Sequence, residues 1–465
     1  MKTTKQRQIP TGRKVAYSLP AFALALVGIP VYVHIPKFYT DVVGVSIVWV
    51  GGILLFIRLF DAFTDPLLGI VSDRTRSPMG RRRPYILGGS LLLSAAILLL
   101  FIPPELGAEA STAWFAVTVF ALFFFWTVTA VPYEALGPEL TTDYSERTSL
   151  FALRDGLLIA GTLMAAAAPV IIDSILASAT FVERERSKFF WMAALYIPLL
   201  TGTCIWCVYR IREKGTFAGA SALPRLRDLK GIMRNRPFMI LMISYAIGAL
   251  GSNLPATLIL YYVEYVLEST HANLFLLMYF FSGIAMLPLW IKLARHIGKK
   301  WAWLASMALN TCAFMGVFFL GAGDEWQYAV LVVVSGFGFG ATLALPSAIQ
   351  ADVIDYDELL TGKRQEGWYI GIWSVVKKLS AAVGVGAGLT IMGAVGYTPG
   401  KEQPEEVIWT LRVMYALVPC LCNVIAFGVA LYFPISKSVY EEIQDGIANR
   451  KSGAPVVDPL KPSSR

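Results

Sequence analysis

Long apolar stretches, interrupted by short polar segments, dominate the pattern of this chain. Runs such as 97–102 and 114–126 extend into stretches of about 20 residues, the length with which an α-helix crosses a bilayer. The pattern predicts an all-α membrane protein with 12 transmembrane helices and no sizeable soluble domain between them. The predicted spans cover residues 15–38, 46–71, 84–103, 112–136, 151–178, 189–211, 237–267, 272–294, 301–321, 328–348, 368–396 and 408–434.

Composition supports this interpretation. Of the 465 residues, 56% are hydrophobic and only 15% are charged, and the mean hydropathy is +0.59. These values are typical of a protein that lives in a lipid bilayer. The sequence shows no nucleophile–base pair or metal cluster and holds only 3 histidines, so we do not expect an enzyme.

The distribution of basic residues predicts the orientation. Residues 1–14 are basic and contain no acid, which places the N-terminus in the cytoplasm. Alternate loops are basic as well, whereas Asp41, Glu105 and Asp324 lie in the opposite loops. We therefore expect a multi-pass protein of the inner (cell) membrane with both termini cytoplasmic. The net charge of +8 is an orientation signal, and nucleic-acid binding is a poor explanation for it.

The longest polar segment between spans divides the chain into two sets of six helices. We predict a cytoplasmic N-terminus at 1–14, a first bundle at 15–211, a basic linker at 212–236, a second bundle at 237–434 and a cytoplasmic tail at 435–465. The loop at 69–83 has a degenerate counterpart at 294–300, which indicates a repeat. Duplicated halves suit a transporter in which rocking exposes a midplane site to each side in turn.

The loop after the second span holds Asp73, Arg74 and the run Arg81, Arg82 and Arg83. One interpretation is topological, because basic residues keep a loop in the cytoplasm. The other is mechanical. Asp73 can accept charge-assisted hydrogen bonds from arginines or helix ends and so hold the cytoplasmic side closed while the site faces outward. Both can hold, and we assign these residues to a cytoplasmic gate.

Three charged residues lie within the second span. At 100° per residue, Arg58, Asp61 and Asp65 fall within an arc of about 60° on one helical face. Charges in the bilayer are costly unless they are paired or face water. An internal Arg58–Asp61 pair that holds helices together is one explanation, but it leaves Asp65 unexplained. The alternative is functional, because two carboxylates one turn apart can bind Na⁺ or take up a proton.

Other spans add polar candidates. Thr127 lies about as deep in the fourth span as Asp61 does in the second, so its hydroxyl can supply a further oxygen ligand. Lys377 and Lys378 lie about 14 Å into the eleventh span. A lysine opposite the aspartates would compete with the cation and link its binding to conformation. Because adjacent residues point about 100° apart, either lysine can be the one that faces a cavity.

The remaining polar residues of the spans have two interpretations. Arg154 and Glu134 suit either a cytoplasmic helix end or a functional charge network. Asn253, with Gly251 and Pro255 beside it, predicts a break in the seventh span, where exposed backbone groups can face a cavity.

Two sets of motifs resemble one family. The segments 38–44, Arg58-x-x-Asp61-Ala-x-x-Asp65-Pro66 and 80–85 form the first set, and 351–367 followed by 375–377 forms the second. Together they resemble the glycoside–pentoside–hexuronide:cation symporters, the melibiose permease branch of the major facilitator superfamily. The resemblance covers nearly the whole chain. It implies the major facilitator fold, with two six-helix halves, and a monomeric protein.

By this resemblance, Asp61 and Asp65 are the cation-site carboxylates and Thr127 is the hydroxyl ligand. The resemblance also matches Lys377 and Arg154 to a buried lysine and an arginine of the family. We add residues of the second motif to the cytoplasmic gate: Asp352, Asp355, Tyr356, Arg364 and Glu366.

The sugar-binding positions depart from the family pattern. Ala25 and Ala130 replace two sugar-binding aspartates, and Leu343 stands at a tryptophan position. Glu134 replaces the other tryptophan, within a Val131–Leu136 segment that resembles the lysophospholipid symporters of the wider family. We assign Tyr133, Glu134, Asn253 and Lys377 to the substrate cavity and expect a substrate other than melibiose.

The sequence thus predicts a symporter driven by Na⁺ or H⁺ that works by alternating access. Its substrate is a sugar glycoside or pentoside by family default, with a lysophospholipid or other amphiphile as the alternative. A membrane receptor or scaffold that does not transport is the hypothesis from another class.

Overall fold

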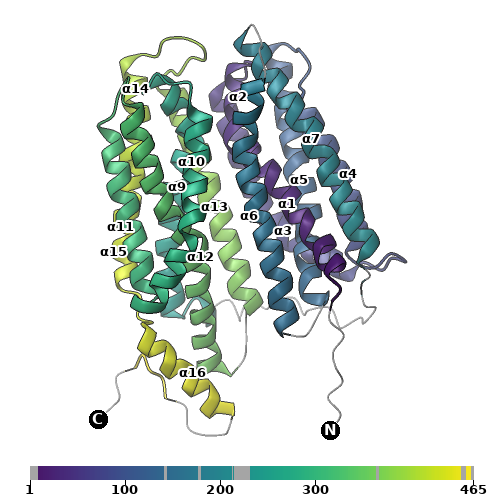
Figure 1. The fold of residues 1–465 in the computed structure, drawn as a ribbon, viewed down its shortest axis with the longest axis vertical. Coiled ribbons are helices and arrows are strands. Elements are labelled where there is room, and N and C mark those ends of the chain that lie inside the picture. The colour runs from purple at the N-terminus through teal and green to yellow at the C-terminus, as the bar shows by residue number, and fades with distance from the viewer. Residues whose placement is uncertain are drawn as a thin grey trace. The chain divides into compact units, whose positions relative to one another are not determined.

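The chain folds into long helices that follow its apolar segments (Figure 1). The computed structural model describes residues 9–140, 144–175, 180–211, 213, 231–362, 366–451 and 457–461. The elements are α1 (Thr11–Ile29), η1 (Pro30–His34), α2 (Ile35–Asp41), α3 (Ile47–Arg74), α4 (Arg83–Phe101), α5 (Ala108–Leu140), α6 (Tyr144–Ile175), α7 (Phe181–Arg210), α9 (Arg236–Tyr265), α10 (Ala272–Ile297), α11 (Lys299–Phe318), α12 (Glu325–Thr361), α13 (Glu366–Ala394), α14 (Glu405–Arg412), η2 (Val413–Leu417), α15 (Val418–Leu431) and α16 (Lys437–Lys451).

The predicted number of spans is confirmed. Within the described residues, 12 helices are long and apolar enough to cross a membrane. The first and the twelfth each contain one π-helical turn, η1 and η2, with a proline nearby in both cases. Proline lacks the N–H group that an α-helix needs, and a π turn absorbs the change in backbone pairing without ending the span.

The predicted break in the seventh span is wrong. Helix α9 runs continuously from Arg236 to Tyr265, and the Asn253 side chain donates a hydrogen bond back to the carbonyl of Ala249 at 2.6 Å. Gly251 serves close packing instead, since a Cβ there would lie 2.6 Å from Cβ of Cys422 on α15. A glycine and a proline in a span can therefore indicate a tight helix contact as well as an interruption.

The chain forms two compact units. The first comprises residues 1–221 and 386–404, and the second comprises 222–385 and 405–465. Within the first, α1 packs against α6 and α7, and α5 packs against α3 and α4. The end of α13 belongs to this unit and packs on α3, where a Cβ at Gly51 would lie 2.9 Å from Cβ of Leu389.

The second unit contains an element that the sequence did not predict. Helix α16 lies within the segment expected to be a tail and packs against α12, burying Ile443 and Ile447. Arg450 of α16 donates to the carbonyl of Leu359 at 2.6 Å. Gly362, with φ at 69°, ends α12 beside this arginine. The segment after the last span therefore closes one end of the second unit.

Glycines bring α10 and α12 into backbone contact in the second unit. A Cβ at Gly340 would collide with the carbonyl oxygen of Gly283, and one at Gly283 would lie 2.9 Å from the carbonyl oxygen of Gly336. Such close approach lets dispersion contacts and weak Cα–H hydrogen bonds hold helices together where lipid removes the hydrophobic driving force.

We expect Gly340→Ala to destabilise the second unit by about 1–3 kcal/mol, because the added methyl group meets backbone. The measurement is the thermal unfolding midpoint of the purified protein in detergent. Gly428→Ala is the matched control, since nothing lies within 4 Å of a Cβ at Gly428. Equal midpoints for the two variants would contradict the packing argument.

Candidate functional site

The side chain of Arg58 connects three spans of the first unit. Its guanidinium carbon lies 4.2 Å from the ring centre of Tyr32 in η1 and 4.0 Å from that of Phe123 in α5. One of its nitrogens, Nη1, lies 3.7 Å from Oδ2 of Asp61, one turn along α3. Arg58 and Asp61 are 6% and 3% exposed. The structure thus contains the Arg58–Asp61 pair, with two aromatic faces that stabilise the cation further.

Asp65 and Thr127 lie at the same level of neighbouring helices. The rings of Phe60 and Phe120 lie 5.2 Å apart, and a Cβ at Gly69 would lie 3.9 Å from Val131. Helices α3 and α5 therefore run in the same direction, with Asp65 opposite the turn that holds Thr127. Thr127 is buried at 3% exposure and Asp65 is partly buried. Two carboxylates and a hydroxyl supply the hard oxygen ligands that a small cation prefers.

A second polar cluster surrounds Tyr17 of α1. The ring of Tyr133 stacks on that of Tyr17 at 5.1 Å, and its hydroxyl donates to the Tyr17 carbonyl at 2.7 Å. Arg154 lies over the Phe151 ring and pairs with Asp155 at 2.7 Å. Tyr133 is buried and Glu134 is exposed. In this position Tyr133 packs α5 against α1. The assignment of Tyr133 to a substrate cavity stays a prediction.

The polar candidates of the second unit lie on α9 and α13. Lys377 is exposed and Lys378 is partly buried. Asn253 of α9 faces α13, since a Cβ at Gly384 would lie 2.8 Å from its Cβ. Their roles in coupling and in a substrate cavity stay predictions.

The run of three arginines at the start of α4 holds a carboxylate through its backbone N–H groups. The N–H groups of Arg81, Arg82 and Arg83 donate to the Glu213 carboxylate at 2.7, 2.9 and 3.0 Å. The Arg83 side chain donates to the carbonyl of Val208 near the end of α7. Gly80 has φ at 109°, and a Cβ there would meet the carboxylate at 2.7 Å. Glu213 is not among the site residues predicted from the sequence, because hydrogen bonds from backbone N–H groups leave no pattern of side chains.

The gate residues predicted in the second unit contact α16 and nearby segments. Lys299 donates to Asp352 at 2.6 Å, and Gln444 of α16 donates to Asp355 at 2.9 Å. The Tyr356 hydroxyl donates to Asp458 at 3.1 Å. Arg364 and the side chains of Asp73 and Glu366 lie outside the described residues. Arg74 is exposed at the end of α3.

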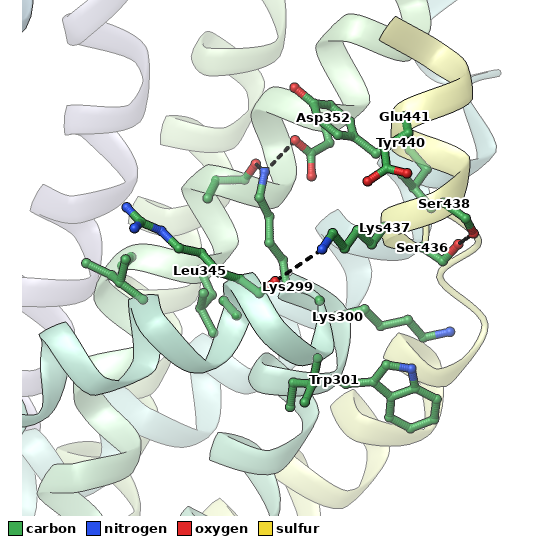
Figure 2. A pocket seen from close by; sticks show the side chains of 18 residues that line it. Lys299, Lys300, Trp301, Leu345, Asp352, Ser436, Lys437, Ser438, Tyr440 and Glu441 are labelled. Atoms are coloured by element: carbon green, nitrogen blue, oxygen red, sulfur yellow. Dashed lines mark hydrogen bonds and ion pairs between the residues drawn. The ribbon is translucent and has the colours of Figure 1, made fainter. Parts of the chain in front are cut away.

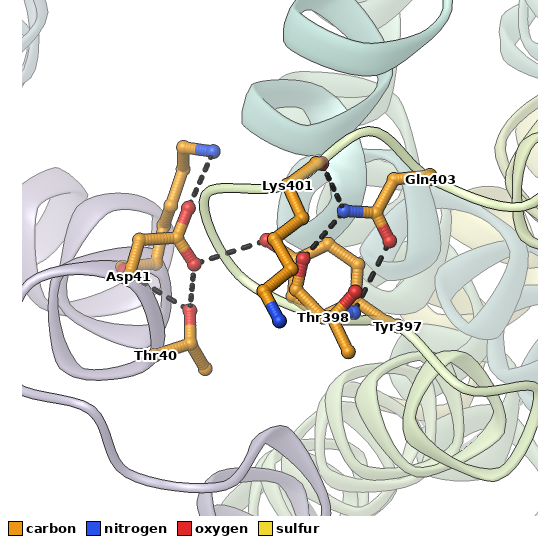
Figure 3. Close-up of polar contacts among 7 residues, drawn as sticks. Thr40, Asp41, Tyr397, Thr398, Lys401 and Gln403 are labelled. Atoms are coloured by element: carbon orange, nitrogen blue, oxygen red, sulfur yellow. Dashed lines mark hydrogen bonds and ion pairs between the residues drawn. The ribbon is translucent and has the colours of Figure 1, made fainter.

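Asp41, at the end of α2, connects to the loop after α13 (Figure 3). Its carboxylate pairs with Lys37 at 2.9 Å and accepts hydrogen bonds from Thr40 at 2.6 Å and Tyr397 at 3.0 Å. Gln403 closes this loop by donating to the carbonyl of Thr398 at 2.5 Å. All these residues belong to the first unit. The network fastens the segment after α13 to the first span.

Long helical spans with buried charges within them are typical of a membrane transporter. A family model described as "MFS/sugar transport protein" matches residues 16–437, and the chain belongs to this family. The resemblance drawn from the motifs is thereby confirmed.

Individual proteins support the assignment. The chain is 28% identical to the "Glucuronide carrier protein homolog" of Escherichia coli (strain K12), over 89% of this chain and 90% of the relative. It is 26% identical to the "Putative glycoside/cation symporter YagG" of the same organism, over 89% of each. A crystal structure of a mutant of the nucleoside transporter NupG aligns with a TM-score of 0.63 at 13% identity, covering 89% of this chain and 100% of that one. This last likeness concerns the fold alone.

We expect Glu213→Ala to lower the thermal unfolding midpoint of the first unit. Three N–H groups at the start of α4 lose a charged acceptor, and hydrogen bonds to charged groups each contribute about 1.5–3 kcal/mol to stability. Glu213→Gln should lower the midpoint less, because its amide oxygen still accepts hydrogen bonds from these N–H groups. The matched control is Glu402→Gln at an exposed position. A midpoint that both Glu213 variants leave unchanged would contradict this role.

We expect Tyr397→Phe to loosen the segment after α13, because the phenol no longer donates to Asp41. Hydrogen–deuterium exchange of residues 395–404 should rise roughly tenfold if one bond to a carboxylate is lost. Tyr432→Phe, at a position that is 74% exposed, is the control. Exchange equal to that of the unchanged protein would mean that the hydroxyl does not hold the loop.

Proposed function

We propose that this transporter of the sugar transport family is a cation-coupled glycoside symporter. The observation that carries the proposal is the pair of aspartates on α3, with Asp61 3% exposed and Asp65 one turn further along. Thr127 on α5 supplies the third oxygen at the level of Asp65. The coupling ion is Na⁺ or H⁺, held by these three side chains.

Charge on this face of α3 supports cation binding. Two aspartates one turn apart stand on this face beside Arg58, whose guanidinium stays charged in proteins. Carboxylates are groups that a bound cation or an added proton can neutralise, and neutralising a charge lowers its cost in a low-dielectric bundle.

Coupling then follows from alternating access. A cation that neutralises the aspartates changes the electrostatic free energy of the site. The conformations differ in how they expose that site, so binding changes their relative populations. Lys377 is the candidate for a competing positive charge, since it is exposed within α13.

The substrate we propose is a glycoside, and an acidic one is the first choice to test. A relative is named for glucuronides, and α13 carries two adjacent lysines that suit a sugar carboxylate. The surroundings of Ala25 support a substrate other than melibiose. A Cβ at Gly161 would lie 2.9 Å from Cβ of Ala25, so α1 and α6 pack tightly there and leave little space for an aspartate. The lysophospholipid alternative finds no support in the relatives described above.

The test uses purified protein in liposomes with an imposed Na⁺ or proton gradient. We expect accumulation of a radiolabelled glucuronide or other glycoside under one gradient. Asp61→Asn and Asp65→Asn should each reduce gradient-driven accumulation by roughly 100-fold or more, because a neutral amide cannot balance the ion's charge. A thermal shift that responds to Na⁺ and Li⁺ identifies sodium as the ion, and one that responds to pH alone identifies the proton.

Asp445→Asn in α16 is the matched control, since Asp445 is exposed and lies outside the spans. It should transport normally. Full coupling in both the Asp61 and the Asp65 variants would overturn the site assignment. Failure of every candidate glycoside under both gradients would count against symport itself and favour a receptor or scaffold.

A further inference from the structure

A cavity of about 720 Å³ lies in the second unit, where α10 ends and α11 begins (Figure 2). Its other walls are α12 and the segment that leads into α16. None of its lining residues belongs to the cation site proposed above. The cavity lies at the junction of two spans, the level at which lipid headgroups meet a membrane protein.

Basic side chains outnumber acidic ones around this cavity. Its lining includes Arg295, Lys299, Lys300 and Lys437 against Asp352 and Glu441. Two of the lysines have partners already. Lys299 pairs with Asp352 at 2.6 Å, and Lys300 donates to the carbonyls of Leu431 and Phe433 at 2.8 Å each.

The two other cations have no carboxylate partner within the described part of the chain. Lys437 reaches across the cavity and makes only a long contact, 3.4 Å, with the backbone carbonyl of Arg295 (Figure 2). No ion pair forms between Lys437 and Glu441, one turn further along α16. Arg295 is exposed, and its guanidinium makes no hydrogen bond to the described residues. The cavity therefore presents two positive charges that an anion can neutralise.

The rest of the lining is apolar and continues onto an exposed surface. Leu345, Ala348 and Ile435 form the inner wall. Ile291, Ile297 and Trp301 form the rim and are 41%, 44% and 55% exposed. A tryptophan at this level is typical of the membrane interface, and apolar side chains exposed on a span face acyl chains. A soluble anion would leave this apolar rim uncovered.

We propose that the cavity binds an anionic phospholipid, with its phosphate between Arg295 and Lys437 and an acyl chain along Ile291, Ile297 and Trp301. Basic pockets between spans are suited to such headgroups. Because α16 supplies Lys437 and Tyr440 to the cavity, the lipid also connects α16 to the end of α10. Binding would thus stabilise the closed end of the second unit. The inference does not depend on the proposed function.

The test measures lipid retention by the full chain, purified and depleted of lipid in detergent. Native mass spectrometry is run with added phosphatidylglycerol, phosphatidylcholine, inorganic phosphate or glycerol 3-phosphate. We expect phosphatidylglycerol to be retained over phosphatidylcholine. Arg295→Gln with Lys437→Gln should weaken its binding roughly 30-fold, at about 1 kcal/mol for each charge near a membrane surface. Lys401→Gln, at an exposed position outside the cavity, should leave it unchanged.

A second variant tests the apolar rim. Trp301→Gln removes the aromatic side chain at an exposed position and should weaken retention of the lipid while leaving the unfolding midpoint of the lipid-free protein unchanged. Three results would overturn the proposal: equal retention of both lipids, retention that the Arg295 and Lys437 changes do not reduce, or displacement of the lipid by inorganic phosphate or glycerol 3-phosphate at equal concentration. The last would identify a site for a soluble phosphate.

Discussion

The cost of burying charge in an apolar bundle is the constraint on which the first unit depends. Arg58 is 6% exposed and cannot become neutral, so the fold has to provide for its charge. Two aromatic rings and one carboxylate do so, and they come from the first, second and fourth spans. The same arrangement that satisfies the arginine therefore brings the aspartates of α3 beside α5. Removing one partner of a buried ion pair typically lowers the free energy of unfolding by about 3–5 kcal/mol, because the other charge loses its compensation.

Basic residues at the span ends have a structural role. Arg83 donates to a carbonyl near the end of α7, Arg450 to one near the end of α12, and Lys300 to the end of α15. The last carbonyls of a helix lack partners within the helix and carry partial negative charge. A cation from a neighbouring element satisfies both needs. Basic side chains thus fasten α4, α11 and α16 to the ends of neighbouring helices.

Helix α13 is the element that the two units share. Its residues up to Val385 pack with the second unit, and those from Gly386 pack with the first. Gly384 lies against Asn253 on one side of this boundary, and Gly386 lies against Leu55 on the other. The chain therefore passes from the second unit to the first between these two glycines. Lys377 lies on the second-unit side of this boundary.

The sequence by itself determined the spans, their approximate ends and the carboxylate face of α3, because an apolar run of bilayer length and a 3.6-residue period are local properties. The family motifs identified the class for the same reason. Only the tertiary structure decided what surrounds Arg58, how the backbone of three arginines holds Glu213, and that α16 packs on α12. It also decided that Gly251 serves helix packing where the sequence predicted a break. These features join residues far apart in the chain through backbone groups and surfaces, and such contacts leave no periodic pattern in the sequence.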